Sequence, residues 1–309
     1  MAILSPAPGE RGARSSGLHC EPVTSASESA DPTRAAQLCA LCGEPGKPWL
    51  EKRGYAHFWC THCDCGFLPT EALPDDFATL YSAEYFAGQR ECGYAGYLRD
   101  QPLLDRNFDR RLAWIESLRK RGRLLEVGCA YGLFLRRARE RGWDVTGVEL
   151  AADCAEIAAA NASAPVLTGD LLEVDLAGRF DVIVMIDVIE HMRDPAACIA
   201  RCSELLVEGG LLVIETGDLE SRWARWLGRR WHFVDPPQHL FYFNASSLRR
   251  LLRRNGIEGP IHSQRLDRQV SLANIAFKLL GPSAGPLLRI PGSVFLDLGD
   301  GMLVAVERS

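Results

Sequence analysis

The stretch LLEVGCAYGLFL, residues 124–135, decides the fold that we expect for this chain of 309 residues. It begins with an apolar run that is typical of a strand buried on both faces of a sheet. It then turns at Gly128 and Gly132 and opens a helix at residue 133. Such a turn lets the backbone approach a ligand closely, with the N–H groups of the first helical turn facing it. The stretch therefore predicts a strand, a ligand-binding turn and a helix.

Apolar runs rich in Val, Ile and Leu alternate with helical patterns beyond this turn. That alternation indicates an α/β fold, in which helices cover both faces of a largely parallel sheet. The strands that we expect, with two late ones near the end of the chain, cover residues 124–127, 145–149, 166–167, 182–186, 211–215, 260–266 and 302–307. The helices that we expect cover residues 108–120, 132–141, 153–161, 195–207 and 246–255, with a helical insertion at 272–280.

Acidic residues stand at the ends of three consecutive expected strands. Glu149 ends the second strand, Asp170 follows the third in the run TGDL, and Asp187 follows the fourth. The carboxyl ends of parallel strands meet at one edge of a sheet, where α/β proteins bind ligands. An acid about twenty residues after a glycine turn can accept hydrogen bonds from both hydroxyls of a ribose. We therefore expect a nucleoside-bearing ligand at this edge, with Asp170 near its adenine.

Together these motifs resemble the class I S-adenosylmethionine-dependent methyltransferase superfamily over roughly residues 108–308. The resemblance is to its small-molecule branch, which includes ubiquinone-biosynthesis O-methyltransferases. It implies a Rossmann-like seven-stranded sheet and S-adenosylmethionine as the cofactor. The matching motifs are the E-x-G-x-x-x-G loop of Glu126, Gly128 and Gly132, the acid Glu149, Gly169-Asp170, the D-x-x-E-H run of Asp187, Glu190 and His191 with Asp194-Pro195, and Glu208-Gly209-Gly210.

The same resemblance implies roles for individual residues. The glycine turn would hold the methionine part of the cofactor, and Ala130 departs from the glycine that many members carry there. The segment YSAEYF resembles a lid over the cofactor, from which we expect a contact by Tyr85. The other cofactor-binding residues that we expect are Glu126, Gly128, Gly132, Glu149, Leu150, Asp170, Leu171, Ile186 and Asp187.

A nicotinamide-dependent oxidoreductase is an alternative, because a glycine turn followed by an acid is also part of the dinucleotide fingerprint. The G-x-G-x-x-G spacing would require glycines at positions 130 and 133, which are Ala130 and Leu133. Another alternative is a non-catalytic scaffold that binds the cofactor and recruits a partner. The intact acids Glu149, Asp170 and Asp187 argue against the scaffold, whereas the glycine spacing, the acid after the third strand and the late strand pair argue against the oxidoreductase.

Methyl transfer to a hydroxyl or carbon acceptor requires removal of a proton, and histidine is the usual base near neutral pH. We expect His239 to act as this base, and His191 is the alternative. The region around residues 218–245 is rich in aromatic residues and forms the insertion that we expect to line the acceptor pocket. The acceptor class that we expect is a small molecule, namely a sugar, a quinone-like compound or a natural-product intermediate.

Cysteine pairs Cys39-x2-Cys42 and Cys60-x2-Cys63 have the spacing of two zinc knuckles. Four thiolates close the coordination shell of Zn²⁺, so the ion would be structural. His62 and Cys65 also have knuckle spacing, so His62 or Cys65 is an alternative to one of these four ligands. A similar N-terminal zinc ribbon occurs in methyltransferase relatives that act on sugars and natural products. The module has few basic residues, which argues against nucleic acid as a partner.

The chain divides by composition into four regions. We expect a disordered tail at 1–36, a zinc-ribbon-like module at 37–70, a linker and cofactor lid at 71–106 and a class I methyltransferase domain at 107–309. The chain has no apolar run of about 18 residues to span a bilayer and no secretory signal. Several cysteines stand singly in apolar segments, which is typical of a reducing compartment. We therefore expect a cytoplasmic protein, and its oligomeric state is open.

Overall fold

The computed structural model describes residues 37–70, 73, 100–265, 268–273, 275–276, 292–296 and 299–309. All of these residues belong to one compact unit, Thr33–Ser309. The expected disordered tail and Tyr85 lie outside the described residues. Most of the expected lid segment 71–106 lies outside them as well.

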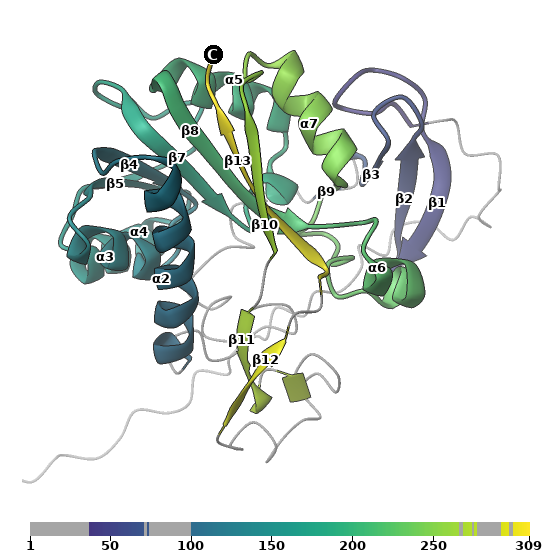
Figure 1. Cartoon of the computed structure of the whole chain (residues 1–309). Coiled ribbons are helices and arrows are strands. Elements are labelled where there is room, and N and C mark those ends of the chain that lie inside the picture. Colours follow the sequence, from purple (N-terminus) through teal and green to yellow (C-terminus); the bar gives the residue numbers. More distant parts are fainter. Residues whose placement is uncertain are drawn as a thin grey trace, which may run out of the picture. The chain divides into compact units, whose positions relative to one another are not determined.

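A seven-stranded sheet forms the centre of the fold, in the order β10-β13-β8-β7-β4-β5-β6 (Figure 1). The strands from β8 to β6 are parallel, and β13 runs antiparallel to both β8 and β10. The strands are β4 (Arg123–Val127), β5 (Asp144–Glu149), β6 (Val166–Thr168), β7 (Phe180–Ile186), β8 (Leu206–Gly217), β10 (Ile261–Arg265) and β13 (Gly301–Glu307). The predicted Rossmann-like sheet of seven strands is confirmed.

Helices cover both faces of this sheet, as the sequence predicts. Along β7, Val182 and Val184 pack into one hydrophobic cluster, while Ile183 and Met185 pack into the other. The first cluster includes residues from α2 (Gln101–Leu118), α3 (Leu133–Glu140) and α4 (Ala152–Ala162). The second includes residues from α5 (Pro195–Leu205) and α7 (Ala245–Arg254). Because neighbouring side chains of a strand point to opposite faces, both faces are buried, which explains the continuous apolar runs.

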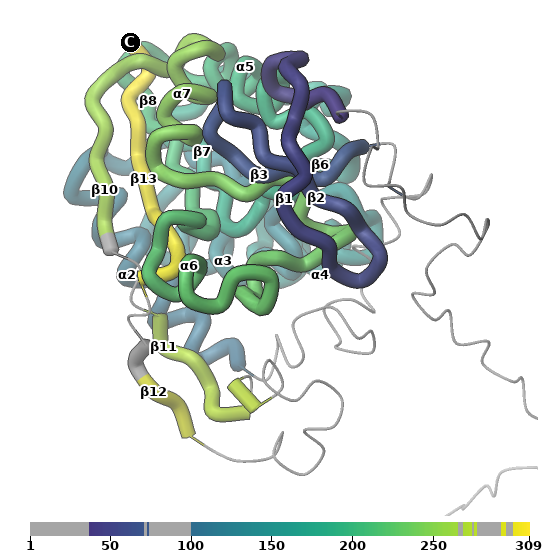
Figure 2. Tube along the Cα trace, turned by 90° about the vertical axis from the view of Figure 1, so that its right-hand side faces the viewer, coloured from purple at the N-terminus to yellow at the C-terminus, as the bar shows by residue number. Residues whose placement is uncertain are grey.

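The cysteine-rich segment forms β1 (Lys47–Lys52), β2 (Tyr55–Cys60) and β3 (Cys65–Phe67). Its sheet has a fourth strand, β9 (Phe241–Tyr242), which comes from the aromatic region after β8. Gly66 pairs with Tyr242 and Phe67 pairs with Phe241 in antiparallel register. In Figure 2 the segments β1 to β3 lie beside the chain that carries β9. The cysteine-rich segment is therefore joined by main-chain hydrogen bonds to the part of the chain that contains the seven-stranded sheet.

Some boundaries differ from the sequence-based expectation. Helix α2 begins at Gln101, seven residues before the expected start at 108, and its second residue is a proline. Proline is tolerated in the first turn because the N–H groups there have no partner within the helix. Strand β8 begins at Leu206 because Leu206 pairs with Phe180, so α5 ends earlier than expected.

Between β10 and β13 the structure forms a hairpin of β11 (Arg268–Ser271) and β12 (Ser293–Leu296), which the sequence did not predict. Residues 272–273 and 275–276 are helical, and the rest of the expected helix at 272–280 lies outside the described residues. Short elements complete the fold, namely η3 (Ile189–His191), α6 (Arg222–Leu227) and η4 (Gly228–Arg230). Among the described residues, no helix is long and apolar enough to cross a membrane.

Candidate functional site

The glycine turn after β4 is held in a conformation that side chains disfavour. Gly128 and Gly132 have φ angles of 69° and 70°. A Cβ at Gly132 would lie 2.7 Å from the carbonyl oxygen of Ala158, and a Cβ at Gly128 would lie 2.7 Å from Cγ2 of Val188. Both glycines are therefore required by close packing as well as by their φ angles. Ala130 also has a positive φ, of 48°, which explains why glycine suits that position.

Glu149, at the end of β5, joins this turn to the start of α4. Its carboxylate accepts hydrogen bonds from the backbone N–H of Ala130 at 2.8 Å and from that of Ala151 at 3.1 Å. The residue is only 5% exposed, and burial raises the pKa of Glu149. Each carboxylate oxygen has two lone pairs, so each can accept one more hydrogen bond. Glu149 can thus hold the turn and still accept hydrogen bonds from two ligand hydroxyls.

Glu126, on β4, is the second buried acid beside the turn. Its Oε2 atom has no hydrogen-bond partner among the described residues, although the side chain is buried. Burial, and then the charge of Glu149, raise the pKa of Glu126 well above its ordinary value. A buried polar atom without a partner costs free energy, which a cationic or hydrogen-bond-donating group of a ligand would offset. This unpaired oxygen fits the amino end of S-adenosylmethionine.

The other expected cofactor residues lie at the same edge of the sheet, with different exposure. Asp170 is exposed, and its Oδ1 accepts a hydrogen bond from the backbone N–H of Leu172. Leu150 is 38% exposed, whereas Leu171 is buried in the core cluster that includes α5. Gly169 donates a backbone hydrogen bond to the carbonyl of Glu149, which ties the end of β6 to the end of β5.

Asp187 is the partly exposed end of an ion-pair network that leads to the buried Glu215 and that the sequence did not predict. It follows Ile186, which is half-buried at the end of β7, and it accepts a hydrogen bond from Arg268 at 3.4 Å. Arg268 also pairs with Glu215 at 2.7 Å, and Arg111 of α2 donates two hydrogen bonds to the same carboxylate. Glu215 is fully buried, which raises its pKa, but the two arginines outweigh burial and hold that pKa below its ordinary value.

The only feature of the sequence that points to this network is an acidic residue within the apolar run of β8. Arg111 and Arg268 are separated by more than 150 residues in the sequence, so no local pattern pairs them. Their positive charges neutralise Glu215, which is what burial of its carboxylate requires, and Arg268 also pairs with the partly exposed Asp187. The network also joins the β11 hairpin to the carboxyl edge of the sheet.

Beyond β7 lies a cluster of Glu190, His191 and His239. One ligand atom of each residue lies within 4.8 Å of those of the others. The rings of His191 and His239 meet edge to face, with centroids 4.5 Å apart. His239 comes from the loop before β9, whose Leu240 donates a backbone hydrogen bond to the carbonyl of Glu190. The structure thus brings together both histidines that the sequence offered as bases, together with a buried acid.

The protonation of this cluster follows from burial. Burial, and then the charge of Asp187, raise the pKa of Glu190 to about 8. The hydroxyl of Thr216 donates a hydrogen bond to Glu190 Oε2 at 2.9 Å. Burial, and then the neighbouring His239, lower the pKa of His191 to about 3. His191 is therefore neutral near pH 7, and its Nδ1 lies 2.8 Å from the carbonyl of Gln238, to which it can donate.

The aromatic insertion packs tightly around the cluster. A small cavity between β8 and this insertion is lined by Glu190, Thr216, Gly217, Trp231, Phe233, His239, Phe241, Tyr242 and Phe243. Most of these rings are buried. The Tyr242 hydroxyl donates a hydrogen bond to the carbonyl of His239 and lies 3.1 Å from Nε2 of His57 on β2. The ribbon is thus connected through one tyrosine to the loop that carries His239.

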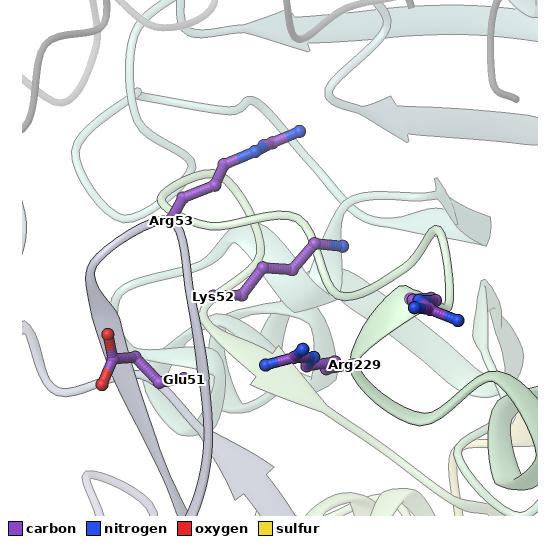
Figure 3. Close-up of a pocket in the computed structure, with 5 residues that line it drawn as sticks. Glu51, Lys52, Arg53 and Arg229 are labelled. Atoms are coloured by element: carbon purple, nitrogen blue, oxygen red, sulfur yellow. The ribbon is translucent and has the colours of Figure 1, made fainter. Parts of the chain in front are cut away.

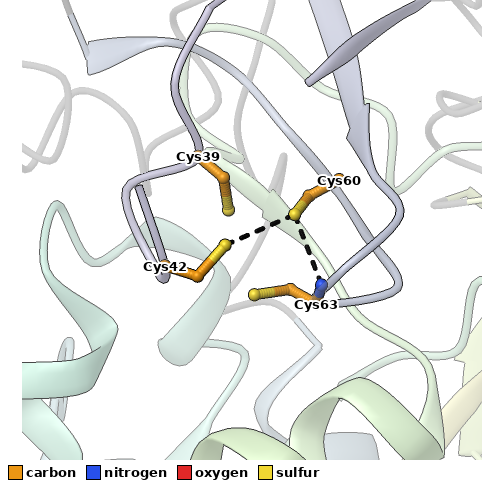
Figure 4. A group of neighbouring side chains, drawn as sticks. All are labelled: Cys39, Cys42, Cys60 and Cys63. Atoms are coloured by element: carbon orange, nitrogen blue, oxygen red, sulfur yellow. Dashed lines mark hydrogen bonds between the residues drawn. The ribbon is translucent and has the colours of Figure 1, made fainter. Parts of the chain in front are cut away.

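The paired cysteines of the ribbon converge (Figure 4). The Sγ atoms of Cys39, Cys42, Cys60 and Cys63 all lie within 4.8 Å of one another, and those of Cys42 and Cys60 are 3.5 Å apart. Four sulfurs at about 2.3 Å from a tetrahedral zinc ion are about 3.8 Å apart, so the cluster fits that ion.

The two alternative ligands have different surroundings. His62 has its Nε2 2.7 Å from a guanidinium nitrogen of Arg254 on α7. Cys65 is buried in the same core cluster as Cys39 and Cys63. The backbone N–H of Cys63 donates to Cys60 Sγ at 3.3 Å, as in a knuckle turn.

Comparison with known proteins assigns the family. The model of a family described as a methyltransferase domain matches residues 94–259, which is more than half of the chain. A ubiquinone biosynthesis O-methyltransferase of Psychrobacter cryohalolentis is 33% identical over 132 residues, covering 34% of this chain and 51% of the relative. One of Cereibacter sphaeroides is 31% identical over 160 residues, covering 45% of this chain and 65% of the relative. The chain therefore spans between about half and two thirds of the length of these relatives.

A solved structure shows the same fold. It belongs to the complex between the Haloferax volcanii Trm112 methyltransferase activator and a methyltransferase. The matched chain is 12% identical, the match covers 76% of this chain and 99% of that chain, and the TM-score is 0.50. The present chain belongs to the methyltransferase-domain family, and the predicted membership of the class I S-adenosylmethionine-dependent methyltransferases is confirmed.

Proposed function

We propose that this chain transfers the methyl group of S-adenosylmethionine to a small-molecule acceptor such as a sugar, a quinone-like compound or a natural-product intermediate. The observation that carries the proposal is Glu149, a buried acid that is bonded to the glycine turn and retains acceptor capacity at the carboxyl edge of the sheet. The unpaired Oε2 of Glu126 would accept a hydrogen bond from the amino group of the same ligand. Asp170 and Leu171 would contact the adenine.

When bound, the cofactor supplies an electrophilic methyl group, so the protein mainly has to orient the acceptor and exclude water. His239 would accept the acceptor's proton, since its half-buried ring lies against that of His191, just beyond the carboxyl end of β7. His191 is held by the carbonyl of Gln238 and would position the ring of His239 rather than act as the base. A general base contributes about 10²- to 10⁴-fold to a rate. We expect His239→Ala to lower transfer of labelled methyl to hydroquinone by that factor, while cofactor affinity changes little.

We propose further that Cys39, Cys42, Cys60 and Cys63 hold a structural zinc ion, since their sulfur atoms converge. The ion would fix the ribbon whose β3 pairs with β9. Elemental analysis of the purified full chain should give about one zinc per chain, and Cys42→Ser should lower it. A metal content far below that would contradict the zinc site and leave the methyltransferase proposal intact.

All nine described cysteines are free of disulfides, which supports a reducing, cytoplasmic setting.

Calorimetry with S-adenosylmethionine tests the central proposal. We expect binding that Glu149→Ala abolishes or weakens at least tenfold, because the substitution removes the acceptor of two backbone N–H groups and of the ribose. Asp144→Ala is the matched control, since Asp144 is an exposed acid at the other end of the same strand. NADH in the same assay tests the oxidoreductase alternative. Absence of S-adenosylmethionine binding, or equal binding by the Glu149 variant, would contradict the proposal. Cofactor binding without transfer to any acceptor would favour the scaffold alternative.

A further inference from the structure

The short helix α6 presents arginine and tryptophan side chains to solvent. Its sequence is RWARWL, and the residues that follow, Gly228-Arg229-Arg230, form η4. Trp226 is 75% exposed and Trp223 is 38% exposed, and their rings contact edge to face with centroids 5.4 Å apart. Two exposed, adjacent indoles are unusual on a protein surface that faces only water.

Helix α6 buries a small residue and turns aromatic and basic side chains outward. Ala224 is buried and anchors the helix. At about 100° per residue, Arg222 and Trp226 lie opposite Ala224, with Arg225 and Trp223 on either side of them. The outward face therefore combines aromatic rings with positive charge. Indole rings and basic groups together are typical of surfaces that rest at the boundary between lipid and water.

A cationic cavity lies next to this face. It has a volume of about 370 Å³ and is lined by Glu51, Lys52, Arg53, Arg229 and Arg230. In Figure 3, the side chain of Lys52, at the end of β1, extends toward the side of the cavity where Arg229 lies, and the carboxylate of Glu51 points away from it. Four of its five lining residues are cations, so the cavity suits a phosphate group.

Local partners already satisfy part of this charge. Arg53 pairs with Asp235 at 2.5 Å, and Lys52 donates a hydrogen bond to the carbonyl of Val234. By contrast, Arg229 and Arg230 form no ion pair with any described residue, and the same holds for Arg222 and Arg225 of α6. These four exposed arginines on one short segment are therefore the charge available to an anionic partner.

We propose that α6, η4 and the β1–β2 turn form a docking face for an anionic phospholipid membrane. Trp223 and Trp226 insert between lipid headgroups, and the cavity beside Arg229 and Arg230 receives a lipid phosphate. Charge complementarity and the paired indoles select this occupant over a soluble phosphate, which would have no use for exposed aromatic rings. The docking is peripheral, and it does not depend on the methyltransferase activity.

The segment that carries this face continues directly into the candidate site. Trp231 follows Arg230 and lines the small cavity that contains His239. Lys52, on the ribbon, lies within hydrogen-bond reach of the carbonyls of Trp231 and Val234. Contact with a membrane would therefore act on the loop that leads to His239.

Sedimentation of the full chain with lipid vesicles tests the docking face. We expect binding to phosphatidylcholine vesicles that contain phosphatidylglycerol, weak binding to phosphatidylcholine alone, and release at about 1 M salt, where the Debye length is about 3 Å. Each arginine near an anionic surface contributes about fivefold to partitioning, so Arg229→Ala/Arg230→Ala should weaken binding about 25-fold. Trp223→Ala/Trp226→Ala should weaken it about tenfold.

The control variant removes the same charge elsewhere. Arg249 and Arg253 are exposed on α7, so Arg249→Ala/Arg253→Ala lowers the net charge equally and should leave vesicle binding nearly unchanged. Equal loss in this variant, or no preference of the unmodified chain for anionic vesicles, would overturn the proposal. Pyrophosphate binding without vesicles, abolished by Arg229→Ala/Arg230→Ala, would assign the cavity to a soluble ligand and overturn it as well.

Discussion

Replacing Glu190 by glutamine should remove a large part of the pH dependence of stability of this protein. Glu190 is 1% exposed, and burial, with the nearby charge of Asp187, raises its pKa from 4.5 to about 8. An unfolded chain releases this proton near pH 4.5, whereas the folded chain keeps it until about pH 8. The unfolded state therefore binds fewer protons in this window, and stability falls as the pH rises through it.

The magnitude follows from the shift in pKa. Each pH unit within the window costs about 1.4 kcal/mol of unfolding free energy, so the loss between pH 5.5 and 7.5 is about 3 kcal/mol. Glutamine has the same shape, carries no proton to release, and can accept the hydrogen bond of Thr216. His191, whose lowered pKa acts in the opposite direction, is present in both proteins and cancels in the comparison.

Urea unfolding of both proteins at pH 5.5 and 7.5, without cofactor, measures the effect. The unmodified protein should lose about 3 kcal/mol more than Glu190→Gln over this interval. Glu204→Gln is the matched control, because the Glu204 side chain is 69% exposed and the substitution removes the same charge from the surface. If Glu190→Gln and the unmodified protein lose stability equally, Glu190 is ionised in the folded protein and the reasoning about its burial is wrong.

Three further predictions concern stability. Gly132→Ala should lower the unfolding free energy measured by urea titration by about 2–5 kcal/mol, since it combines a positive φ with a backbone clash. Gly54→Ala has a positive φ but open space around it, so it should lower the same free energy by only about 1–2 kcal/mol. Equal losses in the two variants would contradict the packing argument. Arg268→Met should cost about 1–3 kcal/mol in urea unfolding by removing one partner of the buried Glu215 carboxylate, and a change below about 0.5 kcal/mol would show that Arg111 suffices. Chelation should release the zinc and lower the Tm by several degrees in a thermal scan, and metal release without a change in Tm would contradict a structural role.

Local sequence was enough to predict the sheet and its ligand-binding edge. The runs of β4 and β7 are largely apolar because both faces of the sheet are covered, and acids stand where the chain leaves the sheet after β5 and β7. The positions of Glu149 and Asp187 follow from strand ends that meet at one edge. The spacing of Cys39, Cys42, Cys60 and Cys63 likewise predicted four sulfurs that converge, as they do.

The sequence does not predict the pairings between distant segments, because no local periodicity marks them. The ribbon sheet takes β9 as its fourth strand, although β9 is more than 170 residues away from β3. Two-residue strands have too little pattern to be predicted, and the register of Gly66 with Tyr242 depends on how the whole insertion packs. The β11 hairpin is a similar case, since Arg268 gains its role only when the fold brings it to Glu215 and Asp187.

The turn LLEVGCAYG by itself determined a strand, a tight turn and a helix that can hold a nucleoside-bearing cofactor, because its glycines and apolar run impose that geometry locally. The tertiary structure decided which groups are charged there. Glu126 and Glu190 become hard to ionise, and Glu215 stays ionised, only because folding removes water from all three and supplies arginines to one. The protonation state of an acidic group depends on the residues that surround it in space, and the order of residues in the sequence does not show which residues these are.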